Sequence, residues 1–434
     1  MKKLLLTFLV LGSMVLHAQE KKDEPKFGIS FSGFLKTDFF YDSRQTVNIR
    51  EGHFLLYPEN EKPDLNGKDI NGKDRFGILS IQSRLTGKIT GPDVFKAKTS
   101  GLLEADFFGN ENGNFSDVNG FRLRHAAIKL NWQNTELLVG QYWHPLFVTD
   151  CFPDVVSFNT GAPFQAFGRH PQIRLTQKVD RLKIIFALAE QRDFTSTGPD
   201  GGSNKYLSNA VVPDLNLHLQ YSTSWDEKKE FLLGVGGEYK TLVPRLSSQI
   251  DKNLKDGADS IYYAGDRKVS TYALTVYSKL KLKPVTIRAY GLYGSNLFDL
   301  AMLGGYAVSS IADAAQNQFE YAGTRNFSLW GEIATNGKIQ AGLFGGYTKN
   351  LGTADPNLGT YYSRGTNINY VFRLSPRFVY NIEKFRIASE FEYTAAQYGK
   401  ANASGEVDAN HVNVSNLRVL VAFYYFFSQV GTKI

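Results

Sequence analysis

The side chains that could do chemistry in this 434-residue chain are scattered and form no recognisable catalytic motif. Three of its seven histidines, His125, His144 and His170, sit among apolar or basic neighbours without a nucleophile and an acid beside them. Cys151 is the only cysteine, which rules out an intramolecular disulfide framework and leaves the scattered histidines without thiolate co-ligands for a metal. A phosphate-cradling glycine-rich loop is also missing from the sequence. We therefore predict no catalytic residues, no metal site and no cofactor.

Charged side chains offer a different chemistry, the selection of ions by an electric field. They recur on the polar faces of alternating segments, with a basic set (Lys96, Lys98, Arg288, Arg373, Arg386) and an acidic set (Glu104, Asp106, Glu238, Glu390, Glu392). Rings of such charges set the selectivity of channels. The formal net charge of +7 also raises the question of nucleic acid, but the chain has no basic helix or basic run. The sequence therefore favours charge used inside a pore and predicts no nucleic-acid partner.

The elements that must position these charges read as long β-strands. Apolar and polar residues alternate over residues 79–89, 95–107, 215–221 and 385–395. Alternation gives each strand one apolar and one wet face. Several runs reach the length at which a tilted strand crosses a bilayer, about 9–11 residues, whereas strands of soluble proteins average about 5–6. No run of about 18 apolar residues is present to form a transmembrane helix. This pattern predicts an all-β transmembrane barrel.

Connector lengths give the number of strands. Short connections occur at 91–93, 133–134, 178–181, 225–229, 282–284, 336–337 and 381–384, and long polar ones at 42–75, 109–120, 145–169, 191–212, 242–267, 296–317, 349–365 and 398–410. Seven hairpins give 14 strands, and the first and last strands (28–41 and 414–427) close the ring. We therefore predict about 16 antiparallel strands with short periplasmic turns, long extracellular loops and periplasmic termini. At this size the lumen should be a water-filled channel and not a packed core.

The N-terminus carries an export signal. Lys2 and Lys3 precede a short apolar run, and Ala18 is a small residue before a plausible cleavage point. We predict a signal peptide over 1–18, a short periplasmic segment over 19–26 and the barrel over 27–434. Sec-type export would place the protein in the bacterial outer membrane, with the lipid bilayer and lipopolysaccharide as its surroundings. Aromatic residues make up 14% of the chain, as expected for the aromatic girdles of a barrel.

The third long connection, 145–169, is unusually apolar for a loop. Its apolar residues include Phe147, Phe152, Phe158 and Phe164. Apolar content on this scale implies packing against something. We expect the loop to fold into the barrel, narrow the lumen and leave Asp150, Asp154 and Arg169 to line the gap. Packing on a neighbouring subunit or on the rim is the alternative.

Residues 119–178 carry a resemblance to a known family. The stretches NGFRLRHAAIKL, LLVGQYWHPLF, DCFPDVVSFN and GRHPQIRLTQ resemble the DcaP-like outer-membrane porins, with a clear match over about 75–190. The phosphate-selective porins share the pattern more loosely. The resemblance implies an often trimeric channel for small organic anions such as dicarboxylates. It also implies a basic constriction at Arg84, Arg122, Arg124, Arg169 and Arg174.

Strand parity tests part of that set. Arg84 and Arg174 lie opposite apolar neighbours, which directs them into the lumen. Arg122 and Arg124 share parity with Ile128, so they reach the lumen only if a bulge near Ala126 resets the register; a position above the hydrocarbon band is the alternative. The complete set of candidate pore-lining residues is Arg84, Lys96, Lys98, Arg122, Arg124, Asp150, Asp154, Arg169 and Arg174.

These expectations combine into one hypothesis: passive diffusion of small hydrophilic solutes, with anionic or zwitterionic ones favoured. A phosphate-selective type of porin is the nearest alternative. An outer-membrane barrel enzyme is less favoured, because no nucleophile system accompanies the histidines.

Overall fold

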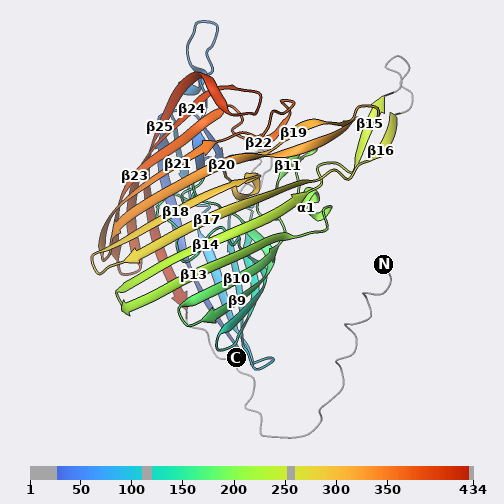
Figure 1. Ribbon diagram of the computed structural model, residues 1–434. Helices are drawn as coiled ribbons and strands as arrows, with labels where there is room; N and C mark the ends of the chain where they lie inside the picture. The colour runs from blue at the N-terminus through green and yellow to red at the C-terminus, as the bar shows by residue number, and fades with distance from the viewer. Residues whose placement is uncertain (1–26, 110–119, 252–259, 430–434) are drawn as a thin grey trace, which may run out of the picture.

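The computed structural model describes residues 27–109, 120–251 and 260–429 and shows a closed barrel of 16 antiparallel strands (Figure 1). Each of the 16 wall strands is called here a stave, and one stave is interrupted, so that it consists of β4 (Arg75–Leu79) and β5 (Arg84–Thr90). The other staves are β1 (Gly28–Asp42), β6 (Lys98–Asp106), β7 (Arg122–Asn131), β8 (Thr135–Trp143), β9 (Arg169–Val179), β10 (Leu182–Ala189), β13 (Asp214–Asp226), β14 (Lys229–Leu242), β17 (Val269–Lys281), β18 (Val285–Ser295), β20 (Gln318–Thr335), β21 (Ile339–Asn350), β23 (Ile368–Ile382), β24 (Phe385–Ala401) and β25 (Val407–Gln429). The predicted fold class is therefore confirmed.

The first and last staves close the ring, as the sequence predicted. β1 pairs with β25 from Phe31 opposite Gln429 to Asp42 opposite Arg418, and on its other side it pairs with β4 and β5. Closure leaves no sheet edge, so every stave finds backbone partners on both sides. In a bilayer this is essential, because lipid cannot hydrogen-bond a free N–H or C=O group.

All seven predicted short connections join neighbouring staves at one end of the barrel. Most connections at the other end are longer and hold the remaining elements: β2 (Thr46–Ile49), β3 (Phe54–Pro58), η1 (Ile70–Gly72), β11 (Thr197–Gly198), β12 (Gly201–Gly202), α1 (Lys205–Ser208), β15 (Ser247–Asp251), β16 (Ser260–Ala264), η2 (Phe298–Leu300), β19 (Gly304–Asp313) and β22 (Tyr361–Arg364). The predicted long connection over 398–410 is wrong, because β24 and β25 extend into it and leave only residues 402–406 between them. In Figure 1 the β15–β16 hairpin projects from this end, beyond the wall. Across the described ranges, no helix has the length and apolar character needed to cross a membrane.

The apolar and wet faces fall where alternation predicted them in β13 and β24. In β13, Leu217 and Leu219 are exposed on the outer surface, while Asn216, His218 and Gln220 are buried inside. β17 alternates in the same way, with Leu274 and Val276 exposed outside and Ala273 buried inside. The outer residues form the lipid-facing band of a transmembrane barrel.

Two predicted strands differ from the structure. Residues 79–89 are not one strand, because residues 80–83 form a turn in which Ser83 N donates to Ser80 O at 3.1 Å. The turn reverses the faces, so Leu79 packs inside while Leu85 lies outside. Residues 95–107 begin later than predicted, since Phe95 and Lys96 take positive φ angles of 53° and 60° in the turn before β6.

The interior is more filled than the sequence suggested. The segment between β8 and β9, residues 144–168 and here called the third loop, lies inside the barrel, where Phe158, Phe164 and Phe167 join a buried cluster with Phe54 of β3 and Leu300 of η2. The expectation of a lumen without a packed core is therefore wrong at this level. The loops supply many of the core's apolar side chains, and inner-wall residues such as Trp330 and Phe344 pack in the same cluster.

Some predictions fall on residues that the structure does not describe. These are the signal peptide over 1–18, the periplasmic segment over 19–26, most of the loop over 109–120 and the last residues of the tail, 430–434.

Candidate pore and solute site

The third loop is held against the wall by polar contacts made along its length. Glu390 Oε2 on β24 accepts from the backbone N–H groups of Val156 at 2.6 Å and Ser157 at 2.8 Å. Glu392 Oε1 accepts from Asn159 Nδ2 at 2.7 Å, and Arg373 of β23 donates to Ala162 O at 2.9 Å. Hydrogen bonds to ionised groups are among the stronger ones in proteins. The predicted inward folding of the loop is confirmed.

Asp154, a predicted lining residue, takes part in this attachment. Its backbone N–H donates to Glu332 Oε1 of β20 at 3.0 Å, and its carboxylate lies 3.2 Å from Arg377 Nη2 of β23. Arg377 also pairs with Glu332, as does Arg288 of β18 at 2.7 Å. Asp154 therefore anchors the loop across a wall network that itself contains both signs of charge.

The bulge needed to turn Arg122 and Arg124 inward is present. Glu104 pairs with His125 and Ala105 with Leu123, so Arg124 is an extra residue in β7, two positions before Ala126. Both arginines then reach Asp106 of β6, Arg122 at 2.8 Å and Arg124 at 2.9 Å. A bulge of this kind re-aims side chains at a functional surface.

Four of the predicted basic residues form one ion-pair cluster, called here the arginine cluster. Arg124 pairs with Glu104 at 2.7 Å, and Arg84 lies 3.6 Å from the same carboxylate. Arg169 pairs with Asp193 at 2.6 Å, which Arg122 also approaches. The members of the cluster are Arg84, Arg122, Arg124, Arg169, Glu104, Asp106, Asp193 and Arg50.

Asp193 was missed by the sequence analysis because it lies in a polar loop without periodicity. Burial alone would raise its pKa, but the guanidinium groups of Arg169, Arg50 and Arg122 hold the pKa of Asp193 well below its usual range. Arg124 and Arg169 are each 1% exposed and so are covered by protein, whereas Arg84 and Arg122 stay partly exposed. In this conformation the cluster is a paired network and not an open ring of positive charge.

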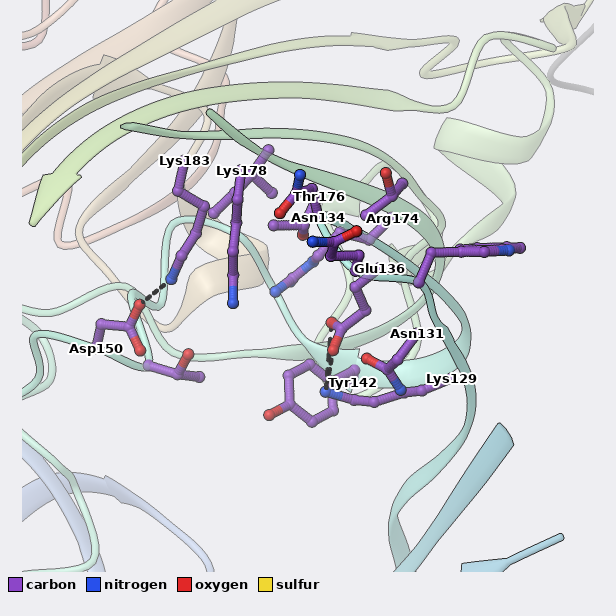
Figure 2. A pocket seen from close by; sticks show the side chains of 15 residues that line it. Lys129, Asn131, Asn134, Glu136, Tyr142, Asp150, Arg174, Thr176, Lys178 and Lys183 are labelled. Carbon is purple, nitrogen blue, oxygen red and sulfur yellow. Dashed lines mark hydrogen bonds and ion pairs between the residues drawn. The ribbon is translucent and has the colours of Figure 1, made fainter. Parts of the chain in front are cut away.

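A polar cavity of about 320 Å³ opens at the short-turn end, between the wall and the third loop (Figure 2). The turn at 132–134 and the inner faces of β7, β8, β9 and β10 form its wall, and Thr149 and Asp150 of the third loop form the opposite side. Arg174 is the predicted residue that lines it together with Asp150. Parity explains the wall, since Arg174, Thr176 and Lys178 alternate with outward-facing Ile173 and Leu175.

Positive charge is in excess in this cavity. Lys183 pairs with Asp150 at 2.6 Å and Lys129 with Glu136 at 3.3 Å, on opposite sides of the space in Figure 2. Lys178 lies between these pairs, and the hydrogen bonds of Arg174 within the described part of the chain go to neutral groups, Gln172 Oε1 at 2.9 Å and Trp143 O. In the described ranges neither Arg174 nor Lys178 has a carboxylate within ion-pair distance. Two cations therefore remain available to an anion.

Asp150 is fixed as a carboxylate at this site. Burial alone would raise its pKa, but Lys183 and the Gln220 amide hold the pKa of Asp150 below its usual value. Beyond Asp150 and Arg174 the space narrows to a pocket of about 30 Å³, lined also by Phe147, His218 and Tyr277. Both spaces are bounded by the third loop on one side and by the wall on the other.

Lys96 and Lys98 lie elsewhere. The structure places Lys96 in the turn before β6 and Lys98 at the first position of β6, both exposed at the short-turn rim. Lys129, Lys178 and Lys183 line the cavity but were not singled out from the sequence. Lys178 lies four residues after Arg174 in the same strand, so both side chains point to the same face of the sheet. This parity could have identified Lys178 as a lining residue from the sequence.

Sixteen staves, short turns at one end and a third loop folded into the lumen together define a porin-type transmembrane barrel. No family model matches the chain, and no curated protein matches it either. Among solved structures, the outer membrane channel DcaP of Acinetobacter baumannii is similar at 17% identity and a TM-score of 0.63, over 93% of this chain and 98% of that one.

Two further solved structures show the same fold. An anion-selective porin from Comamonas acidovorans is similar at 10% identity and a TM-score of 0.51, over 93% of this chain and 100% of that one. The trimer form of OmpT from Vibrio cholerae is similar at 12% identity and a TM-score of 0.50, with the same coverage. At these identities the likeness concerns the fold, and it supports the fold that the resemblance to DcaP-like porins implied.

Proposed function

We propose that this chain is an outer-membrane porin for passive diffusion of small hydrophilic solutes, favouring small organic anions such as dicarboxylates. The observation that carries the proposal is the cavity beside the third loop, in which, among the residues that the structure describes, Arg174 and Lys178 have no carboxylate partner while Lys183 and Lys129 do. A solute with one or two carboxylates supplies the negative charge that these two cations lack. The similar porin from Comamonas acidovorans is anion-selective, which agrees with this preference.

The geometry suggests how such a solute passes. A carboxylate entering the cavity exchanges part of its water shell for the N–H groups of Arg174 and the ammonium of Lys178. The Asp150 carboxylate on the third loop repels the solute, and the cations on the wall attract it. These opposite charges create a transverse electric field across the cavity. Transport requires binding that is favourable enough to admit the solute and weak enough to release it. A partly hydrated cavity with two cations fits that balance better than a closed ion-pair cage.

The other candidate lining residues keep subordinate roles in this proposal. Arg84, Arg122, Arg124 and Arg169 add positive potential from the arginine cluster, and Lys96 and Lys98 attract anions to the short-turn rim. Asp154 acts through the loop that it anchors. Fields from such charges raise the local concentration of oppositely charged solutes.

A phosphate-selective channel is the nearest alternative, since the same two cations would attract inorganic phosphate. An enzyme is less favoured: His144 and His170 lie inside the packed interior, and neither lines the cavity. We also propose, from the implied family and from the trimer form of OmpT, that the barrel assembles as a homotrimer in a bilayer with lipopolysaccharide. A mass measurement of the purified protein in detergent tests the assembly state.

Current block by added solutes tests the proposed preference. In planar bilayers, succinate should reduce the current through the parent channel at concentrations where its uncharged diamide does not. Arg174→Ser with Lys178→Ser should weaken that block at least several-fold, because the solute loses both free cations. Lys338→Ser, in the short turn after β20, is the control and should block like the parent. Stronger block by phosphate than by succinate would favour the alternative, and equal block of parent and double variant would reject the site.

A further inference from the structure

A second group of buried charges lies at the root of the third loop, apart from the lining of the solute cavity. His144 follows β8 directly, Asp214 is the first residue of β13, and Glu238 lies on β14. One ligand atom from each of these residues lies within 4.8 Å of the other two, and all three side chains are buried. The three residues are far apart in the sequence, which is why the spacing of histidines and acids predicted no metal site.

The group carries more negative than positive charge. Lys240 Nζ lies 2.9 Å from Glu238 Oε1 and 2.8 Å from Asp299 Oδ1, and all of these side chains are nearly inaccessible to solvent. In the described ranges Lys240 is the only lysine or arginine that pairs with Asp214, Glu238 or Asp299. With the histidine rings neutral, one ammonium faces three carboxylates. Uncompensated carboxylates are costly in a low-dielectric interior, so protons or a cation must offset the excess.

The hydrogen bonds leave ligand atoms in place for a cation. Asp214 Oδ1 accepts from Asn216 Nδ2 at 3.1 Å, and Asp214 Oδ2 lies 2.9 Å from His144 Nε2. Glu238 Oε1 is occupied by Lys240, but Glu238 Oε2 is buried without a hydrogen-bond partner among the described residues. A buried carboxylate oxygen with no donor is unusual and calls for an explanation.

We propose that His144 Nε2, Asp214 Oδ2 and Glu238 Oε2 bind a divalent transition-metal cation of the Zn²⁺ class. One imidazole and two carboxylates form a borderline ligand set that suits Zn²⁺ better than Ca²⁺ or Mg²⁺, which prefer oxygen alone. Asn216 and Lys240 would orient the two carboxylates from behind, the role that outer partners play in metal sites. This site stands independently of the proposed transport function.

Binding requires two small adjustments. His144 must carry its proton on Nδ1 and give up the 3.3 Å contact from Leu146 N–H, so that the Nε2 lone pair faces the metal. The ligand atoms must also settle at roughly 3.3 Å from one another, the spacing set by metal–ligand bonds of about 2.0–2.1 Å in a tetrahedron, so His144 Nε2 and Asp214 Oδ2 must separate slightly from their 2.9 Å contact. Both changes involve side chains, and the strands that carry Asp214 and Glu238 stay paired.

The consequence would be structural. Because His144 opens the third loop, the cation ties the root of that loop to β13 and β14, and Lys240 extends the link to Asp299 of η2. A chain whose lone cysteine allows no intramolecular disulfide gains a staple in this way. Metal bound only by the folded state adds its binding free energy to stability.

The test uses the full chain, refolded in detergent after chelation. Bound Zn²⁺ is measured by equilibrium dialysis and native mass spectrometry, and the folded fraction by heat-dependent gel mobility. The parent should bind about one Zn²⁺ per folded chain and show a higher thermal transition with Zn²⁺ than without it. Glu238→Gln and Asp214→Asn should lose that binding by at least tenfold, whereas Glu230→Gln, at the other end of β14, should keep it.

Two results would overturn the proposal. The first is a folded parent that binds no Zn²⁺ above the level of the Glu238→Gln chain, which would mean that shared protons neutralise the carboxylates. The second is full Zn²⁺ binding in Glu238→Gln, which would place the metal elsewhere. If Asp214→Asn does not fold, Glu238→Gln carries the test, because its amide oxygen can still accept from Lys240.

Discussion

At the scale of single residues, the interior charges fall into two states that predict different behaviour. Arg122, Arg124 and Arg169 are paired in the arginine cluster, whereas Arg174 and Lys178 face the cavity without a carboxylate partner among the described residues. A charge that is neutralised by its neighbour attracts a passing ion weakly. Charged residues that strand parity places in the lumen are therefore not equivalent. Their ion-pair partners, which only the structure shows, distinguish the neutralised charges from the available ones.

Asp193 should matter for stability far more than an exposed aspartate. Replacing it by asparagine leaves Arg169, already 1% exposed, and Arg122 with one carboxylate fewer. Breaking a buried pair by removing one partner typically costs about 3–5 kcal/mol. We expect a loss of that order in the unfolding free energy measured by denaturant titration in lipid vesicles. Asp226→Asn, in an exposed pair with Lys229, should change it by less than about 1 kcal/mol.

The same residue gives a dependence on pH. The pKa of Asp193 is held low in the folded state, so the stability it contributes is present above its unfolded pKa of about 3.9 and lost as pH falls below that value. The parent should lose unfolding free energy through this acid range, and Asp193→Asn should show a shallower loss. Parallel acid profiles for the two proteins would show that Asp193 does not supply the effect.

At the scale of elements, the attachments of the third loop should control the size of the passage. Glu390→Gln with Glu392→Gln removes the negative charge that receives Val156 N–H, Ser157 N–H and Asn159. We expect a folded barrel whose single-channel current is larger and noisier than the parent's, since the loop is held to the wall less tightly. Glu230→Gln, a carboxylate outside this attachment, serves as the control. Unchanged current and noise in the double variant would mean that other contacts hold the loop.

The strands were predictable where alternation is strict and the turn chemistry is clear. β13, β24 and all seven short connections follow the sequence pattern. The prediction failed over 79–89 because a turn at 80–83 preserves an apparent alternation while it reverses the faces. That turn is stabilised from another stave, since Lys36 N of β1 donates to Ser83 Oγ at 3.0 Å. A contact between distant parts of the chain cannot be read from local periodicity.

At the scale of the whole molecule, the stability cost of a charge on the outer surface should depend on its depth in the bilayer. Val276 lies near the middle of β17 on the outer face, and Tyr272 lies on the same face nearer the long-loop end. Val276→Arg should cost about 2–4 kcal/mol of unfolding free energy in lipid vesicles, and Tyr272→Arg about 0–1 kcal/mol. Equal costs for the two variants would contradict the placement of this wall in the hydrocarbon layer.

The site was only partly predictable because it is made by the interior of the whole barrel. Parity placed Arg174 inside, and the apolar third loop brought Asp150 to it. The pairing of Arg169 with Asp193, and the filling of the lumen by Phe54 and Leu300, depend on which loops fold inward together. The local sequence of those loops does not indicate which residues they contact.

The selectivity of the unmodified channel tests the central claim most directly. The full chain is inserted into a planar bilayer with a potassium chloride gradient, and the reversal potential is measured. An excess of unpaired positive charge beside the third loop predicts stable conductance with a reversal potential of the sign that marks anion selectivity. A cation-selective reversal potential, or a folded barrel without conductance, would contradict the account.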